Sequence, residues 1–318
     1  MLGPLKWAFS MRDINLIRAP FNLGLRPLRS GHEPGTWRAP QALTEAGLVE
    51  ALAPVQVIDL ERPAYSIEPQ PGTKLRNGPA IRSFNLRLAD IVADAVGQAA
   101  FPLVVGGDCS ILLGALAGAR RSGPLSLVHV DGHSDFRHPG NDDDNLPLSS
   151  AAGMDLAAAT GRGEALLTEW PGIEGPLLRD DQVVQIGERE SRDVDYAWRD
   201  LEATEITPVD VFAARELGAA GVLVKAEPVL ARGGRHWLHF DVDALDQAVM
   251  PAVDSPGSPG IDSDELVAIL GELVARPGCV GMNVTIFDPD LDPTGELAIW
   301  LVNFLRRVFV PLAGTSGR

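Results

Sequence analysis

Acidic residues and a histidine of the kind that bind divalent cations follow one apolar run near the middle of the chain. The motif DGHSDF begins at Asp131, directly after the run Leu125–Val130. A short run of this kind predicts a buried parallel strand. Because alternate residues of an extended segment share one face, Asp131, His133 and Asp135 can converge on one point beyond that strand. We therefore interpret them as candidate metal ligands.

Two further motifs end apolar runs in the same way. His236–Asp246 reads HWLHFDVDALD and places Asp241 and Asp243 after a run, while Pro102–Ser110 reads PLVVGGDCS and places Cys109 after a glycine turn. Ligands bind at the carboxyl ends of strands in open α/β sheets. Several acids with one histidine suit Mn²⁺ better than an all-sulfur zinc site does. Close acids repel one another without bound cations, so the pattern favours two metals over one.

The elements that must position these motifs alternate along the chain. Apolar runs at Ile14–Ala19, Val55–Leu60 and Val183–Gly187 predict strands, and helical periodicity spans Ser83–Ala99. Such alternation predicts right-handed βαβ units and a parallel sheet. We expect a single domain over residues 1–318, with a three-layer α/β/α architecture and a central, mostly parallel sheet.

Four further segments refine this prediction. A helix is expected around Pro40–Leu52, and Val222–Val224 is a short strand candidate. Asp262–Val274 begins with an aspartate that can cap a helix and has a glutamate three residues on, which is the pattern of a capping box. The apolar segment Glu296–Phe309 predicts a closing helix.

In their order along the chain, GGDCS, DGHSDF and HFDVDALDQ resemble the motifs of the arginase/agmatinase/formiminoglutamase (ureohydrolase) family. That family has GGDHS, then DxHxD, then S/HxDxDxxDP. The resemblance also reaches GTWRAPQALTEAGL near the N-terminus and VTIFDPDLDPTG near the C-terminus, so it covers nearly the whole chain. It implies an arginase-like fold and a dinuclear Mn²⁺ site.

The resemblance also implies a role for each motif residue. Six side chains would hold the two metals: Cys109, Asp131, His133, Asp135, Asp241 and Asp243. Asp131 and Asp241 would bridge both metals, and His133 and Asp243 would complete the second. Asp135 would serve the first metal and, in the family, lies close to the hydroxide. Asp135 and His133 are therefore the candidate catalytic residues.

Three positions depart from the family pattern. Cys109 stands where the family has a histidine on the first metal, and a thiolate suits Mn²⁺ less well than an imidazole does. Cys109 is thus either a ligand or a buried thiol, and a one-metal state is the alternative to two. Ala152 replaces an active-site histidine, and Asn283 replaces a guanidinium-binding glutamate. Asn283, His239 and Asp155 are the candidate substrate-binding residues, with core packing as the alternative for His239.

The implied activity is hydrolysis of a C–N bond in a linear amidine by a metal-bridging hydroxide, and the implied substrates are guanidino, hydroxyguanidino or formimino compounds. Asp135 would relay a proton to the departing amine. Because asparagine cannot pair as an ion with a guanidinium, Asn283 favours a substrate less basic than arginine. Two other functions stay open. One is a metal-binding regulatory or assembly homologue that has lost catalysis, and the other is a Zn²⁺-dependent deacetylase-like amidohydrolase, whose usual histidine pair is absent from the sequence.

Composition excludes some partners. The formal charge of −16 argues against binding to nucleic acid or to an anionic membrane, and no apolar run approaches the ~20 residues of a membrane span. Cys109 and Cys279 form no disulfide framework, which predicts a cytoplasmic setting.

The acidic stretch Asn141–Asn145 is expected to be a solvated loop at the lip of the site. The family resemblance implies a small-molecule amidine as partner, and a homo-oligomer, either a trimer or a hexamer.

Overall fold

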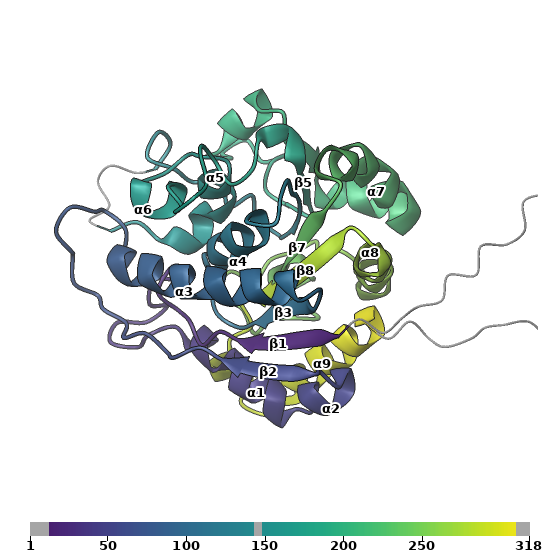
Figure 1. The fold of residues 1–318 in the computed structure, drawn as a ribbon, viewed down its shortest axis with the longest axis horizontal. Helices are drawn as coiled ribbons and strands as arrows, with labels where there is room; N and C mark the ends of the chain where they lie inside the picture. Colours follow the sequence, from purple (N-terminus) through teal and green to yellow (C-terminus); the bar gives the residue numbers. More distant parts are fainter. Residues whose placement is uncertain (1–12, 143–147, 310–318) are drawn as a thin grey trace, which may run out of the picture.

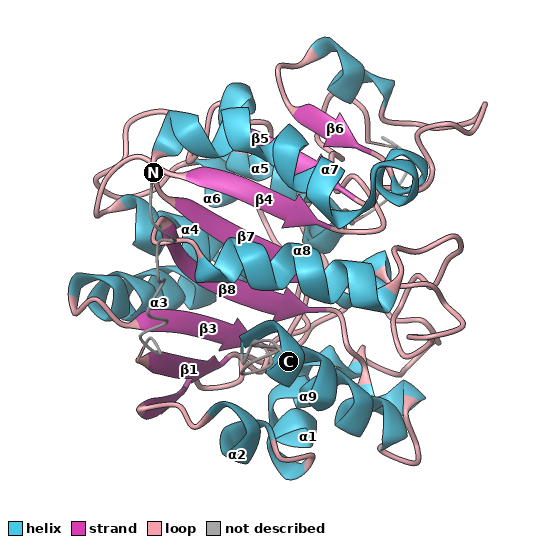
Figure 2. Cartoon of the chain, turned by 90° about the vertical axis from the view of Figure 1, so that its right-hand side faces the viewer, coloured by secondary structure: helices cyan, strands magenta, loops and turns pink. Residues whose placement is uncertain are grey.

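The computed structural model describes residues 13–142 and 148–309 and has one eight-stranded sheet at its centre (Figure 1). The strands are β1 (Ile14–Arg18), β2 (Gln56–Asp59), β3 (Phe101–Val105), β4 (Ser126–Val130), β5 (Val183–Ile186), β6 (Thr207–Val209), β7 (His236–Asp241) and β8 (Cys279–Thr285). Their spatial order is β2-β1-β3-β8-β7-β4-β5-β6, and every neighbouring pair is parallel. The carboxyl ends of the central strands therefore lie at one edge of the sheet (Figure 2).

Helices cover both faces of the sheet. They are α1 (Ala39–Glu45), α2 (Leu48–Leu52), α3 (Gly78–Gly97), α4 (Ile111–Arg120), α5 (Asp155–Ala159), α6 (Ala165–Thr168), α7 (Val211–Gly233), α8 (Ser263–Ala275) and α9 (Glu296–Phe309). Buried side chains of α1, α2, α7, α8 and α9 pack with one face of the sheet, and those of α3 to α6 with the other. The three-layer fold with a parallel sheet is thus confirmed. Among the described residues, no helix is long and apolar enough to cross a bilayer.

The central strands are buried on both faces, which explains their continuous apolar runs. All residues of β3, β4 and β7 are buried, whereas the edge strand β2 is largely exposed. Neighbouring residues of one strand serve opposite cores: Leu238 packs with α8 and α9, whereas Trp237 packs with α3 and α4. This alternation also decides which polar side chains share a face.

Most of the expected elements are present. The strands predicted at 14–19, 55–60 and 183–187 form, and the helix expected over 40–52 is split into α1 and α2. The Asp262 carboxylate accepts hydrogen bonds from the backbone N–H groups of Asp264 and Glu265, as a helix cap does. Of the acidic stretch 141–145, residues 143–145 lie outside the described residues.

The strand predicted at Val222–Val224 is wrong, because these residues lie inside α7. Val222 is buried, but Val224 is 70% exposed, so the two do not share a strand-like buried face. The buried residues instead recur at helical spacing, at Val222, Ala226, Val229 and Leu230. Three apolar residues were too few to distinguish the two periods.

Two glycines of α4 allow this helix to lie close to α3. A Cβ atom on Gly118 would lie 2.4 Å from the carbonyl oxygen of Ala89, and one on Gly114 would lie 2.5 Å from the Asn85 side-chain oxygen. Because α4 begins directly after the turn that carries Cys109, this packing holds that turn against the sheet.

We expect Gly118→Ala to lower the free energy of unfolding by about 1–3 kcal/mol, because α4 must move away from α3. The matched control is Gly97→Ala at the last residue of α3, where a Cβ would meet no heavy atom within 4 Å. Both variants gain helix propensity, so their difference isolates the overpacking. Urea denaturation measures it, and equal stability of the two variants would contradict the packing argument.

Candidate metal centre

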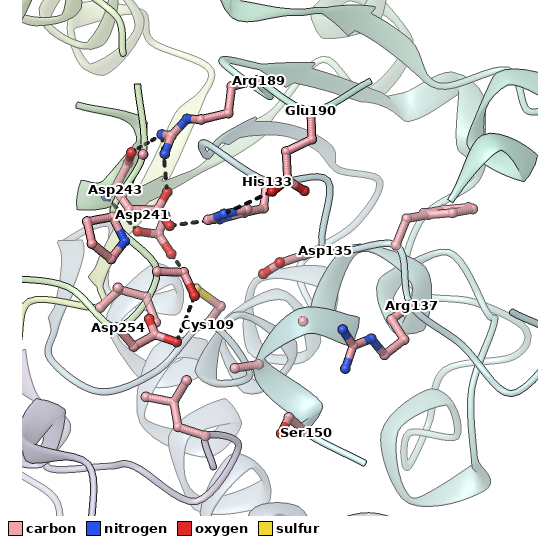
Figure 3. Close-up of a pocket in the computed structure, with 18 of the residues that line it drawn as sticks. Cys109, His133, Asp135, Arg137, Ser150, Arg189, Glu190, Asp241, Asp243 and Asp254 are labelled. Carbon is pink, nitrogen blue, oxygen red and sulfur yellow. Dashed lines mark hydrogen bonds and ion pairs between the residues drawn. The ribbon is translucent and has the colours of Figure 1, made fainter. Parts of the chain in front are cut away.

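The three sequence motifs meet at the carboxyl edge of the sheet, where β3, β8, β7 and β4 lie side by side. Their side chains line one cavity of about 350 Å³ (Figure 3). Cys109, His133, Asp135, Asp241 and Asp243 all face this cavity, while Asp131 is buried beside them. The structure thus brings the six candidate ligands together.

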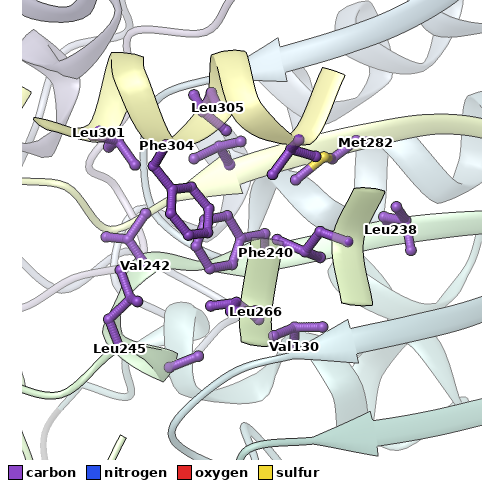
Figure 4. Close-up of a cluster of buried hydrophobic side chains, with 14 of the residues drawn as sticks. Val130, Leu238, Phe240, Val242, Leu245, Leu266, Met282, Leu301, Phe304 and Leu305 are labelled. Carbon is purple, nitrogen blue, oxygen red and sulfur yellow. The ribbon is translucent and has the colours of Figure 1, made fainter. Parts of the chain in front are cut away.

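Packing on the opposite face of β7 positions Asp241. Phe240 and Val242, on either side of it in sequence, belong to the apolar cluster under α8 and α9 (Figure 4). The Phe240 ring stacks on Phe304 with centroids 5.5 Å apart. With its neighbours held in this core, Asp241 turns to the cavity.

Asp131, His133 and Asp243 form a group that we name the His133 cluster, and their ligand atoms lie within 4.8 Å of one another. His133 Nδ1 is 2.8 Å from Asp243 Oδ2 and 3.8 Å from Asp131 Oδ1. Burial lowers the pKa of His133, but the carboxylates of Asp243 and Asp131 raise it, to about 10 overall. Two carboxylates and one imidazole at this spacing are a donor set that fits a divalent cation.

Cys109, Asp131, His239 and Asp241 form a second group, the Cys109 cluster, again with ligand atoms within 4.8 Å. The Cys109 thiol donates to Asp241 Oδ2 at 2.8 Å and lies 3.4 Å from Thr285 Oγ1. Burial, and then the charges of nearby acids led by Asp241, raise the pKa of this thiol well above its ordinary value. The two clusters share Asp131.

Asp135 lies in the loop that follows β4 and has a strained backbone conformation. Its φ of 46° is in the left-handed region, which is costly for a residue with a side chain and is common at functional sites. Burial, and then the charges of Asp131 and Asp155, raise the pKa of its carboxyl well above the ordinary range. Its carboxyl therefore holds a proton more readily than that of an exposed aspartate.

The candidate substrate-binding residues Asn283, His239 and Asp155 are placed differently from the expectation. All three are fully buried and, within the described part of the chain, none is among the residues that line the cavity. His239 and Asn283 face each other in the sheet register, inside β7 and β8 rather than beyond them. Their side chains therefore lie one layer below the strand ends.

His129 was missed in the sequence. It lies two residues before Asp131, as His239 lies two before Asp241, and this repeated HxD spacing is a signal that pointed to it. The two rings stack with centroids 4.6 Å apart and planes at 18°. His129 Nε2 lies 3.2 Å from Asp155 Oδ1.

The rest of the cavity wall is mixed in character. The apolar Ile286, directly after β8, lines one part of it, and Ala152, in the short 3-10 helix Ala151–Met154, lines another. Arg137 lies across the cavity from Cys109 (Figure 3), and its Nε is 3.7 Å from Asp142 Oδ1. Arg137, Arg189, Glu190 and Asp254 line the cavity but were not identified in the sequence.

Comparison with known proteins was made at the level of sequence and of fold. Residues 12–310 match the sequence model of the Arginase family. The arginase of Bacillus caldovelox is 30% identical over 94% of this chain and 98% of its own length, and arginase-1 of Sus scrofa is 29% identical over 93% and 91%. The solved structure of Bacillus caldovelox arginase superposes with a TM-score of 0.81 at 26% identity, covering 96% of this chain and all of that one (100%).

We expect Asp243→Asn to weaken Mn²⁺ binding by about 100-fold or more, since loss of a residue that only supports a ligand typically costs about 10- to 100-fold. The matched control is Asp246→Asn. The Asp246 carboxylate accepts hydrogen bonds from Ser258 Oγ and Gly260 N, and it is not among the cavity-lining residues. Isothermal titration calorimetry compares the two, and similar affinities in both variants would count against the His133 cluster as a cation site.

Proposed function

Because the chain belongs to the arginase family, we propose that it is a metal-dependent hydrolase that cleaves a C–N bond of a small linear amidine. The observation that carries the proposal is the group formed by Asp131, His133 and Asp243, whose ligand atoms lie within 4.8 Å of one another beside a cavity. The arginase-family match favours this function over the deacetylase-like alternative.

The residues that would hold the cation are Asp131, His133, Asp241 and Asp243. Carboxylate oxygens with a single imidazole favour Mn²⁺ among common divalent ions. When bound, such a cation polarises water and so supplies a nucleophile near neutral pH. His133 contributes by directing Nδ1 toward Asp243 and Asp131.

Asp135 is the residue that we assign to proton transfer. In the reaction, water adds its oxygen to the amidine carbon and gives a proton to the Asp135 carboxylate, the C–N bond breaks, and Asp135 passes that proton to the departing amine. A carboxyl group whose pKa is raised above the ordinary range by burial suits this role. The products are urea, or a related amide, and an amine.

The walls of the cavity favour a substrate less basic than arginine. A guanidinium gains most from a carboxylate that binds it in a bidentate manner. The cavity wall after β8 instead has the apolar side chain of Ile286, and Ala152 also lines the cavity. Asn283, the position where we expected a contact to the amidine, is buried within the sheet. Formimino and hydroxyguanidino compounds therefore rank ahead of free arginine.

The first experiment measures urea and ammonia release by protein loaded with Mn²⁺, across a panel of guanidino, hydroxyguanidino and formimino compounds. We expect turnover that is lost on chelation and restored by Mn²⁺. The control is Asp241→Asn, which removes a cavity acid. Cation binding without turnover of any amidine would refute the proposal and favour a regulatory homologue.

A second prediction concerns the far end of the substrate. Arg26 and Arg137 place positive charge in the cavity wall, so we expect substrates with a carboxylate to be preferred. Arg137→Met should lower kcat/KM about 10- to 100-fold for carboxylate-bearing amidines, the value of a charged hydrogen bond. The matched substrate is the decarboxylated analogue, for which we expect little change. An equal loss for both substrates would exclude a charge-specific contact.

A further inference from the structure

Three buried atoms beneath the cavity face one another without hydrogen-bond partners in the described structure: Asp131 Oδ2, Asp155 Oδ2 and His239 Nε2. His239 Nε2 lies 3.7 Å from Asp131 Oδ2 and 3.8 Å from Asp155 Oδ2. All three residues are at most 1% exposed. Unpaired polar atoms at this depth are costly. Two arrangements remove the cost: a cation bound by three lone pairs, or a hydrogen on Nε2 directed at the two carboxylates.

The indole of Trp237 decides between them. An indole N–H can only donate, and Trp237 Nε1 donates to Asn283 Oδ1 at 2.7 Å. The amide orientation of Asn283 is thereby assigned, and its Nδ2 group, also a donor, faces His239 Nδ1 at 2.7 Å. His239 Nδ1 must therefore accept through a lone pair. An imidazole with a lone pair on Nδ1 carries its hydrogen on Nε2.

His239 therefore presents an N–H group, rather than a lone pair, to Asp131 and Asp155. A histidine that binds a metal shows the opposite polarity, because it donates its other ring N–H to a carboxylate or carbonyl group. His133 is not fixed in this way: its Nδ1 donates to Asp243 Oδ2 at 2.8 Å without a cation, but its Nε2 faces the carboxylate of Glu190 at 4.0 Å and can carry the hydrogen when Nδ1 binds a cation. His133 can therefore offer a lone pair to a cation, whereas the donor group of Asn283 prevents His239 from doing so.

A second hydrogen donor points into the same group. The Cys109 thiol donates to Asp241 Oδ2 at 2.8 Å. The Cys109 cluster therefore holds one S–H and one N–H group against the carboxylates of Asp241 and Asp131. Asp243 Oδ2, in contrast, faces His133 Nδ1 at 2.8 Å, and its Oδ1 lies 3.9 Å from Arg189 Nη2.

We propose that the chain binds one divalent cation, held by the His133 cluster and Asp241, and that the His239 N–H, fixed in place by Asn283, stands where a second cation would bind. The proposal rests on the proposed function only for the presence of the first cation. Trp237 and Asn283 act as positioning residues, since they set the polarity of His239 without lining the cavity.

The test counts cations in purified protein that was loaded with excess Mn²⁺ and desalted, by mass spectrometry of the metal. We expect about one Mn²⁺ per chain, and an electron paramagnetic resonance spectrum without coupling between two Mn²⁺ ions. In Asn283→Asp, a carboxylate accepts from both Trp237 Nε1 and His239 Nδ1, which moves the hydrogen to Nδ1 and frees Nε2. This variant should bind about two Mn²⁺ per chain.

The matched control is Asn283→Leu, which cannot accept a hydrogen bond and should stay at one Mn²⁺. Two equivalents in the wild type would overturn the proposal, as would a folded Asn283→Asp that still binds one. The count does not depend on turnover, so it separates failure of this proposal from failure of the hydrolase assignment.

A second measurement needs no folded Asn283→Asp variant. The chain has six histidines, so ¹⁵N-histidine labelling gives a tractable spectrum of the metal-free wild type. The His239 signals are assigned by their loss in His239→Asn. A hydrogen on Nε2 supports the proposal, and a hydrogen on Nδ1 overturns it.

Discussion

The crowding of carboxylates at one edge of the sheet is the constraint on which the rest of the site depends. Asp131 directly follows β4 and Asp241 is the last residue of β7, and because these strands pair in parallel, the two acids cannot separate without breaking that pairing. Their burial strengthens the repulsion between them, because a poorly solvated interior screens charge weakly. Each neighbouring feature supplies positive charge or hydrogen to them: the imidazole of His133, the thiol of Cys109 and the ring of His239.

The His133 cluster and the Cys109 cluster share Asp131 but differ in the kinds of ligand atom they contain. The His133 cluster combines an imidazole with two carboxylates at the cavity surface. The Cys109 cluster lies deeper and is closed from below by the stacked rings of His129 and His239.

The fold and the ligand motifs were predictable because they depend on local patterns. Apolar runs that end in acids mark parallel strand ends, and Asp131, His133 and Asp135 all reach the site, although Asp135 does so on a left-handed backbone rather than by strand-like alternation. The role of Asn283 was not predictable, because it depends on which residue lies opposite it in the neighbouring strand. The register pairs His129 with His239 and His239 with Asn283. Such pairing across strands distant in sequence leaves no local pattern.

The row formed by His129, His239 and Asn283 also bears on how the site can change over time. The strand register holds these side chains opposite one another. A substitution can therefore change which of them presents a donor or a lone pair to the carboxylates without any change in the backbone. Asparagine and aspartate codons differ by a single base. On the proposed assignment, one point mutation at residue 283 moves the His239 hydrogen from Nε2 to Nδ1. Proteins that bind one cation and proteins that bind two can therefore differ by a single substitution.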